Sequence, residues 1–146
     1  MTAPLFLIPI LVGLITQALK RVLNKNWHAI PAPGGYLPRY GGMPSAHTAF
    51  VFSLATVVAA VDGFLSTSFA IAASMVIFVL DDALRMRIFL GQHGAALHRL
   101  VSLLRVEERE KFPPLVAHLG HKPTEVTVGA VLGVVLTLLV LSFLSP

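Results

Sequence analysis

Residues 126–146 read VTVGAVLGVVLTLLVLSFLSP, a run of 21 residues without a charge. A helix needs about 20 apolar residues to cross a bilayer, so this stretch predicts a membrane span. The whole chain of 146 residues has the same character, with 55% hydrophobic residues, 12% charged residues and a mean hydropathy of +0.80. Soluble domains contain about 25% charged residues. We therefore predict an all-α integral membrane protein that forms a single membrane domain over residues 1–146.

Three further apolar runs precede this stretch. The predicted spans cover about residues 3–22, 45–62, 64–81 and 124–144. We expect the first to be a retained span rather than a cleaved signal peptide, because its basic residues follow the apolar run instead of preceding it. The pattern therefore predicts four transmembrane helices.

Two segments between these spans have a mixed composition. Residues 24–44 are rich in proline, glycine and aromatic residues, which indicates an irregular loop at the level of the lipid headgroups. Residues of about 84–111 mix apolar side chains with arginine and histidine at helical spacing. That spacing predicts an amphipathic helix lying in the interface between the third and fourth spans.

The charges divide unequally between the two predicted faces. All 11 Lys and Arg residues and all 6 His residues fall on one face, whereas the other has Asp62 and nothing basic. Basic loops stay in the cytoplasm, so we predict a multi-pass cell-membrane protein with this face cytoplasmic. The isoelectric point near 10 then reflects orientation beside the lipid bilayer and not binding to nucleic acid. The chain has no cysteine, which excludes disulfides and thiolate metal sites.

The stretch GGMPSAHT, which ends at Thr48, stands directly before the second predicted span. Gly42 permits a close backbone approach, and Pro44 suits the first turn of a helix. The first N–H groups of that helix would point toward a bound anion, while Ser45 adds a hydroxyl and His47 a proton. The stretch predicts a phosphate-binding corner, with a plain helix cap as the alternative reading.

A second informative stretch, HKPTEV, begins at His121. At a spacing of four on a helix, Glu125 can hold one ring nitrogen of His121 and leave the other as a nucleophile or base. With His47, Ser45 and Lys20 this set suits a phosphoryl group, because cations and N–H groups stabilise its oxygens. Snorkelling at the end of the first span is the alternative reading of Lys20.

These residues resemble a known family. Pro44–His47 is similar to the Pro-Ser-Gly-His motif of the type 2 phosphatidic acid phosphatase superfamily, which also contains vanadium haloperoxidases. The closer resemblance is to its divergent small membrane branch, in which Gly-Gly-Met-Pro-Ser-Ser-His, Tyr-Asp-Ala with a following Arg, and Gly-His-Thr-Pro-x-Glu-Val occur in this order. The corresponding residues here are Gly41–His47, Asp81–Ala83 with Arg87, and Gly120–Val126. The resemblance covers roughly residues 15–135.

The resemblance implies a role for each matching residue. His121 would be the nucleophile that forms a phosphohistidine, Glu125 its orienting carboxylate, and His47 the general acid on the leaving alcohol. The phosphate would be bound by Lys20, Ser45, Arg87 and Arg85, with Asp82 orienting Arg87 and with Gly42 and Pro44 in support.

The chain departs from the superfamily pattern in its arginines. Trp27 stands seven residues after Lys20, where the superfamily has Arg-Pro, and Leu115 replaces an arginine six residues before the histidine. Either Arg87 or Arg85, with Arg39 as a further candidate, is expected to supply the missing cations.

The resemblance implies a metal-independent, cofactor-free phosphatase acting on a lipid phosphate in the membrane. Its substrate would be phosphatidate-like, phosphatidylglycerophosphate or a prenyl diphosphate. One alternative is a metal-dependent phospholipid transferase that uses Asp81 and Asp82, although such sites need several spaced carboxylates. Another is a non-catalytic scaffold or carrier that binds lipid phosphates. The pair Gly129 and Gly133 is expected to permit close helix packing, within the bundle or in a homo-oligomer.

Overall fold

The computed structural model describes residues 5–23, 30–32, 35–37, 42–109, 111–112 and 122–144. These residues are predominantly helical, as the sequence predicts. The elements are, in order, α1 (Leu7–Leu23), β1 (Ile30–Ala32), β2 (Gly35–Leu37), α2 (Ala46–Asp62), α3 (Thr67–Asp81), the π-helix η1 (Asp82–Met86), α4 (Arg87–Ser102), α5 (Val106–Arg109) and α6 (Pro123–Leu144).

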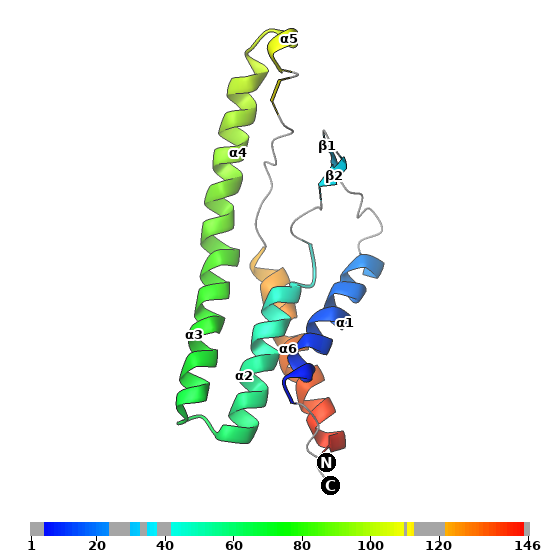
Figure 1. Ribbon diagram of the computed structural model, residues 1–146, viewed down its shortest axis with the longest axis vertical. Coiled ribbons are helices and arrows are strands. Elements are labelled where there is room, and N and C mark those ends of the chain that lie inside the picture. The colour runs from blue at the N-terminus through cyan, green and yellow to red at the C-terminus, as the bar shows by residue number, and fades with distance from the viewer. Residues whose placement is uncertain are drawn as a thin grey trace.

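Helix α2 is the centre of the bundle, because it packs against α1, α3 and α6. Figure 1 shows these helices side by side, with the start of α1, the turn between α2 and α3, and the end of α6 at one end. The end of α1, the start of α2 and the start of α6 consequently lie at the opposite end. The residues of the candidate site belong to that second end.

Local sequence explains where these helices begin and end. Gly63 ends α2 with a φ of 84°, a left-handed conformation that glycine adopts without strain. Ser66 then caps α3, since its hydroxyl accepts a hydrogen bond from the N–H of Phe69 at 3.1 Å. Pro123 occupies the first position of α6, where its missing N–H costs no hydrogen bond.

The protein core is small, and much of its exterior is apolar. Ile8 and Val12 of α1 pack with Ala49 and Val57 of α2 to form the buried cluster. Large apolar side chains remain exposed along the outer helices, including Phe78 at 70% and Phe143 at 87%. Water-soluble proteins rarely present contiguous apolar surface of this extent, so the exterior suits a hydrocarbon solvent.

Among the described residues, two helices are long and apolar enough to cross a membrane, namely the continuous helix over 67–102 and α6. Helix α2 is also apolar but has 17 residues, which gives a length of about 26 Å against a hydrocarbon core of about 30 Å. The four stretches predicted as spans fall in α1, α2, α3 and α6.

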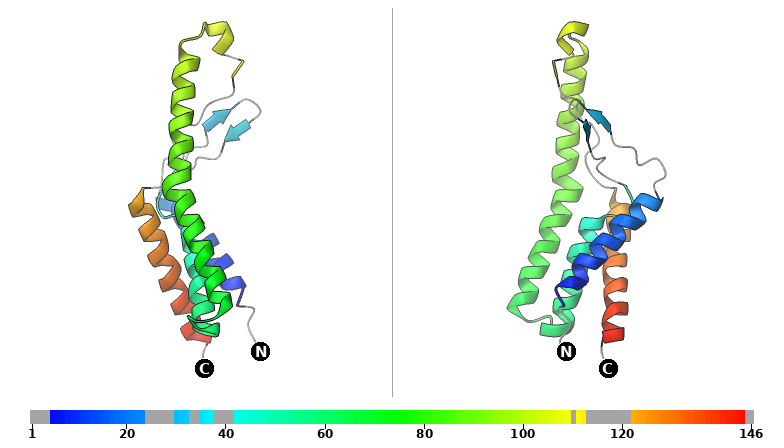
Figure 2. Two further views of the ribbon diagram at one scale, coloured as in Figure 1. Left: turned by 90° about the vertical axis from the view of Figure 1, so that its left-hand side faces the viewer. Right: turned by 45° about the vertical axis from the view of Figure 1, so that its right-hand side comes forward.

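Helices α3 and α4 form one continuous helix. This corrects the prediction of a separate interfacial helix over about residues 84–111. The π-turn η1 joins them without a break into a helix of 36 residues, about 54 Å long. Figure 2 shows that α4 projects beyond the ends of α1, α2 and α6 along the axis of α3. Residues 84–111 are therefore helical over most of their length, as predicted, but residues 84–102 continue the helix of the third predicted span and do not form a separate helix across its end.

The predicted irregular loop over 24–44 contains a short hairpin. β1 pairs with β2 in antiparallel register, with Ile30 opposite Leu37 and Ala32 opposite Gly35. The sequence between the strands is Pro33-Gly34, a dipeptide typical of tight turns.

Candidate functional site

The turn before α2 is joined directly to the first turn of α6. The backbone N–H of Ser45 donates a hydrogen bond to the backbone carbonyl of Glu125 at 3.1 Å. Ser45 is fully buried at this junction, and Pro44 beside it is buried as well. The two sequence stretches that predict phosphate chemistry therefore meet through their main chains.

Two glycines of α6 make this close approach possible. A Cβ atom at Gly129 would collide with the carbonyl oxygen of Ser45, and its next nearest atoms would be the carbonyl carbon and Cβ of Ser45 at 3.2 Å. A Cβ atom at Gly133 would collide with the carbonyl oxygen of Ala49 in the same way. The glycine pair thus packs α6 against α2, backbone to backbone.

The hydroxyl of Ser45 does not cap α2. It accepts a hydrogen bond from the Thr48 hydroxyl at 2.9 Å, and it makes no bond to an N–H of the first helical turn. The positive end of the helix dipole and its first N–H groups therefore remain directed at the space before α2. The Ser45 hydroxyl is the acceptor in the bond from Thr48, so its own proton takes no part in that bond.

Charged side chains from four other elements converge on this end of α2. Lys20, in the last turn of α1, is buried with 6% of its surface exposed. It interacts electrostatically with Glu125 and Arg87. His47 is exposed in the first turn of α2, and the charges of Arg87, Lys20 and Asp82 act on it. Residues from α1, α2, η1, α4 and α6 thus share one electrostatic site.

The π-turn positions the arginine of this site. Nε of Arg87 donates to Oδ2 of Asp82 at 2.6 Å, and the backbone N–H of Arg87 bonds to the carbonyl of Asp82. In an α-helix, the side chains of residues five apart point about 140° away from each other. The wider π-turn instead places them on the same side of the helix. The pair expected from the sequence, Asp82 with Arg87, therefore forms because the helix contains this turn.

Arg85 occupies a different surface. Its Nη1 pairs with Oδ1 of Asp81 at 3.0 Å, and its side chain is 73% exposed. The Arg87 side chain is only 25% exposed, and its charge acts on both Lys20 and His47. Of the two arginines proposed from the sequence, Arg87 is the one that the structure brings to the site.

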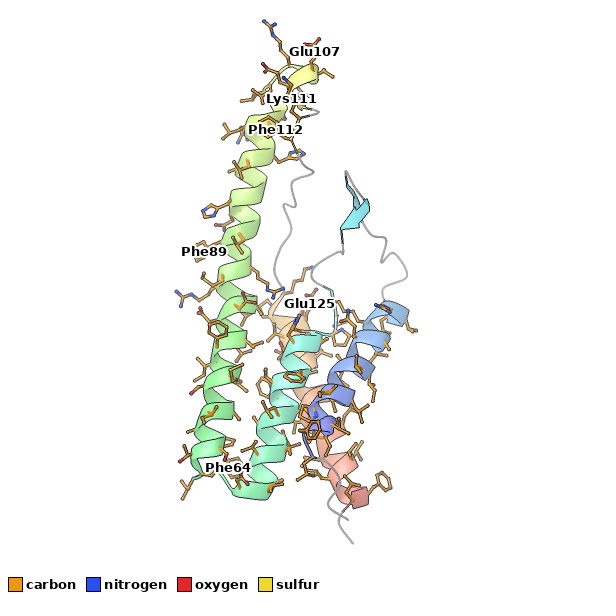
Figure 3. All side chains as sticks on the ribbon, viewed as in Figure 1. Phe64, Phe89, Glu107, Lys111, Phe112 and Glu125 are labelled. Carbon is orange, nitrogen blue, oxygen red and sulfur yellow. The ribbon has the colours of Figure 1, made fainter. Side chains whose placement is uncertain are left out.

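Glu125 has a structural task at the start of α6. Its Oε2 accepts the backbone N–H of Lys122 at 3.3 Å, which is the return half of a capping box. Figure 3 shows Glu125 level with the start of α2, at the end of the bundle opposite to Phe64. The carboxylate therefore lies at the site and caps α6 at the same time.

Several predicted residues lie outside the described ranges. These are His121, the proposed nucleophile, together with Arg39, Trp27 and Leu115. Gly42 is described, and its φ of 90° is a conformation that favours glycine. Within the described ranges, no three His, Asp, Glu or Cys side chains come together as a metal site.

No role is predicted from the sequence for Thr48, although it follows Ser45 by one helical turn, a spacing that places the two hydroxyls on one face. The predicted close packing at Gly129 is found, but no signal in a single sequence identifies Ser45 as its partner.

Comparison with known proteins identifies the family of this chain. The sequence profile described as the Divergent PAP2 family matches residues 1–136. The chain is also 34% identical to a Bacillus subtilis (strain 168) protein named uncharacterized membrane protein YuiD, over 70% of this chain and 72% of that protein. No solved structure matches. The chain is therefore a membrane protein that belongs to the divergent PAP2 family.

Proposed function

We propose that this protein is a metal-independent phosphatase that hydrolyses a lipid phosphate within the membrane. The observation on which the proposal rests is the hydrogen bond between Ser45 and Glu125. It brings the phosphate-binding turn and the start of α6, which follows His121, into one site with Lys20 and Arg87.

The proposed reaction has two steps. A ring nitrogen of His121 attacks phosphorus, the bond from phosphorus to the ester oxygen breaks, and His47 gives its proton to the leaving oxygen. Water then attacks the phosphohistidine, which releases inorganic phosphate and restores His121. The protons balance over the two steps. His47 gives one proton to the leaving oxygen in the first step and takes one from the attacking water in the second.

The remaining residues of the site would bind the phosphoryl oxygens. Lys20 and Arg87 supply positive charge, and the first N–H groups of α2 supply oriented donors. The hydroxyl of Ser45 adds a further donor. Because only 6% of the Lys20 surface is exposed, its interaction with a phosphoryl group would be stronger than in solution.

The proposal includes a membrane orientation. We propose that α1, α2, α3 and α6 all cross the membrane, with the site at the cytoplasmic face of the cell membrane. The distribution of basic residues supports this orientation, because all the described ones lie at or beyond the end of the bundle that carries the site. The headgroup would enter from the interface while its chains stay in the lipid.

A non-catalytic lipid-phosphate-binding protein is the second candidate. The observation that favours it is the capping bond of Glu125, which already engages the carboxylate proposed to orient His121. A metal-dependent transferase has less support, since Asp81 and Asp82 each form an ion pair with an arginine.

The test is phosphate release by the purified protein in detergent with EDTA. The substrates are phosphatidic acid, phosphatidylglycerophosphate and a prenyl diphosphate, and the variants are His121→Ala and His47→Ala. His98→Ala is the matched control, because His98 lies exposed on α4, outside the bundle. We expect release by the parent protein and the control, and its loss in both site variants.

Other outcomes would identify the alternatives. Phosphate release that requires added Mg²⁺ would support a metal-dependent site that uses Asp81 and Asp82. Binding of inorganic phosphate without turnover of any lipid on the panel would support the non-catalytic protein.

A further inference from the structure

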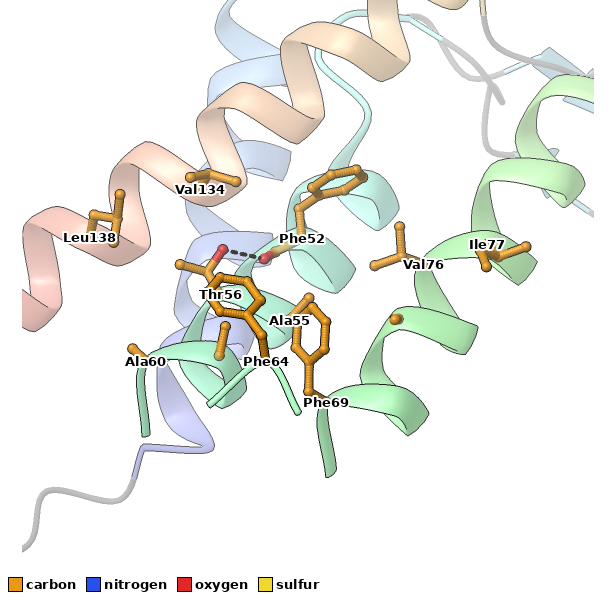
Figure 4. Close-up of a pocket in the computed structure, with 12 residues that line it drawn as sticks. Phe52, Ala55, Thr56, Ala60, Phe64, Phe69, Val76, Ile77, Val134 and Leu138 are labelled. Carbon is orange, nitrogen blue, oxygen red and sulfur yellow. Dashed lines mark hydrogen bonds between the residues drawn. The ribbon is translucent and has the colours of Figure 1, made fainter. Parts of the chain in front are cut away.

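A pocket of about 650 Å³ lies between α2, α3 and α6, below the candidate site. Figure 4 shows α6 and α3 on either side of α2, with the pocket between them. Its volume is within the range of about 300–1,000 Å³ that is typical of small-molecule sites. The pocket is thus large enough to hold part of a ligand.

The lining of this pocket is suited to hydrocarbon. Its residues are alanines, phenylalanines, valines, a leucine, an isoleucine and one threonine. The hydroxyl of that threonine, Thr56, already donates to the carbonyl of Phe52 at 2.7 Å, as the dashed line in Figure 4 shows. The lining side chains therefore offer a ligand no free hydrogen-bond donor and only the Thr56 oxygen as an acceptor, so a charged group would be unfavourable there.

Both walls of the pocket lead to the phosphate site. On α2, Phe52 lies seven residues after Ser45, which corresponds to about 10 Å along the helix. On the long helix, Ile77 lies five residues before Asp82, or about 8 Å from the turn that holds Arg87. An extended molecule can therefore have its phosphate between Ser45 and Arg87 and its apolar part in the pocket.

Two aromatic rings line the end of the pocket that lies away from the candidate site. Phe64, in the turn between α2 and α3, and Phe69, in the first turn of α3, form an edge-to-face pair with ring centroids 5.1 Å apart and an interplanar angle of 74°. Figure 4 shows both rings directed between the two helices. Because the α2–α3 turn lies at the end of α2 opposite Ser45, the pair limits the depth of the pocket.

We propose that this pocket holds one hydrocarbon chain of the lipid whose phosphate binds between Ser45 and Arg87, and that the Phe64–Phe69 pair limits the length of that chain. The inference rests on the proposed function for the position of the phosphate. The inference predicts that the protein binds one hydrocarbon chain of its lipid substrate as well as the phosphate. A protein that recognises only the headgroup would leave the pocket without a lipid chain.

The test is photo-crosslinking with a phosphatidic acid that carries a diazirine at the end of one chain. Ala73→Trp fills the pocket, since Ala73 lines it. Ala70→Trp is the matched control, because Ala70 is exposed one turn away on the same helix and does not line it. We expect the label on peptides from residues 52–77, about tenfold less of it in Ala73→Trp, and no change in Ala70→Trp.

Competition links the pocket to the phosphate site. Unlabelled phosphatidic acid should displace the label, whereas the corresponding diacylglycerol, which lacks phosphate, should not. Equal labelling of the two tryptophan variants would overturn the proposal. Equal displacement of the label by diacylglycerol and by phosphatidic acid would also overturn it, because lipid bound unspecifically around the protein gives that result.

Chain length tests the aromatic pair. Octanoyl, myristoyl and stearoyl probes should label the parent protein unequally, and Phe69→Ala should shift the preference toward the longer chain. An unchanged preference would overturn the role of the pair.

Failure of the proposed function would give a different result. Pocket labelling that phosphatidic acid displaces, without phosphate release from any lipid, would reject hydrolysis and retain the pocket. Phosphate release with labelling spread over the outer faces of α1 and α6 would retain hydrolysis and reject the pocket.

Discussion

The backbone N–H of Ser45 bonds to the backbone carbonyl of Glu125 at 3.1 Å, although the two residues belong to helices far apart in the sequence. The bond fixes the start of α2 against the start of α6. It depends on the absence of a side chain at Gly129, whose Cβ would collide with the Ser45 carbonyl. The geometry of the site is thus set by a glycine that has no chemical role of its own.

Gly129→Ala should separate α2 from α6 and break this hydrogen bond. Over-packing of a close interface costs roughly 1–3 kcal/mol, so the free energy of unfolding in mixed SDS micelles should fall by about that amount. Phosphate release should fall as well. Gly13→Ala is the matched control, because its Cβ would meet Phe50 at an ordinary 3.5 Å. A stability loss in Gly13→Ala equal to that in Gly129→Ala would contradict this account.

Glu125→Gln should separate the two tasks of this side chain. The amide oxygen can still accept the N–H of Lys122, so the free energy of unfolding should change by less than about 0.5 kcal/mol. Phosphate release should fall about tenfold or more, because hydrogen bonds to charged groups contribute roughly 1.5–3 kcal/mol.

Glu125→Ala should additionally remove the cap and destabilise the protein by roughly 0.5–2 kcal/mol. Full activity in Glu125→Gln would mean that the carboxylate serves only as a cap.

Arg87→Lys and Arg85→Lys should differ in their effect on phosphate binding. Lysine keeps the charge but loses the planar guanidinium and its Nε bond to Asp82. We expect Arg87→Lys to weaken binding of inorganic phosphate about tenfold in calorimetry. Arg85→Lys should change it about twofold or less, since its pair with Asp81 is exposed. A larger effect at Arg85 would reassign the phosphate-binding cation.

Thr137→Val should destabilise the bundle more than Ser53→Ala. The hydroxyl of Thr137 donates to the carbonyl of Gly133 at 2.7 Å, so Ser53 must donate in the buried bond between the two hydroxyls. Thr137→Val leaves Ser53 without that acceptor, whereas Ser53→Ala leaves Thr137 bonded within α6.

A double-mutant cycle in SDS unfolding should give a coupling of about 0.6 kcal/mol between these residues. Ser74→Ala, whose hydroxyl bonds only to its own helix at an exposed position, should have a smaller effect. Equal losses for Thr137→Val and Ser53→Ala would show that the donor assignment is wrong.

Single cysteines test the proposed orientation, and the chain has no native cysteine to interfere. Leu65→Cys lies in the fully exposed turn between α2 and α3, while Ala95→Cys is exposed on α4. In intact cells, an impermeant maleimide should label Leu65→Cys directly and Ala95→Cys only after the membrane is opened. The reverse pattern would place the site outside the cell.

The sequence predicts helices well where one property is uniform over many residues. Uncharged apolar runs mark the helices that became α2, α3 and α6, since hydrocarbon solvent requires this composition throughout a span. The prediction from sequence fails at Asp82–Met86. A π-turn has one residue more than an α-helical turn, and the amino-acid composition does not indicate whether the chain forms it. The helix that contains the third predicted span therefore does not stop at Asp81 but continues through Arg87 to Ser102.

The candidate site shows the same division. Ser45 and His47 can be selected from local chemistry alone, because a helix start with a hydroxyl and a histidine is visible in eight residues. The choice between Arg85 and Arg87 cannot be made locally, because the π-turn decides which of them faces Lys20. The bond from Ser45 to Glu125 connects main-chain atoms, for which side-chain patterns contain no information.

That bond also determines when the site comes into existence. The chain is synthesised from its N-terminus, so Lys20, His47 and Arg87 are made before Glu125. During that interval the surface of α2 around Ala49 lacks its contact with Gly133. Docking of α6 then supplies the missing carbonyl and the glycine face together, and the site is completed in a single late event of biosynthesis.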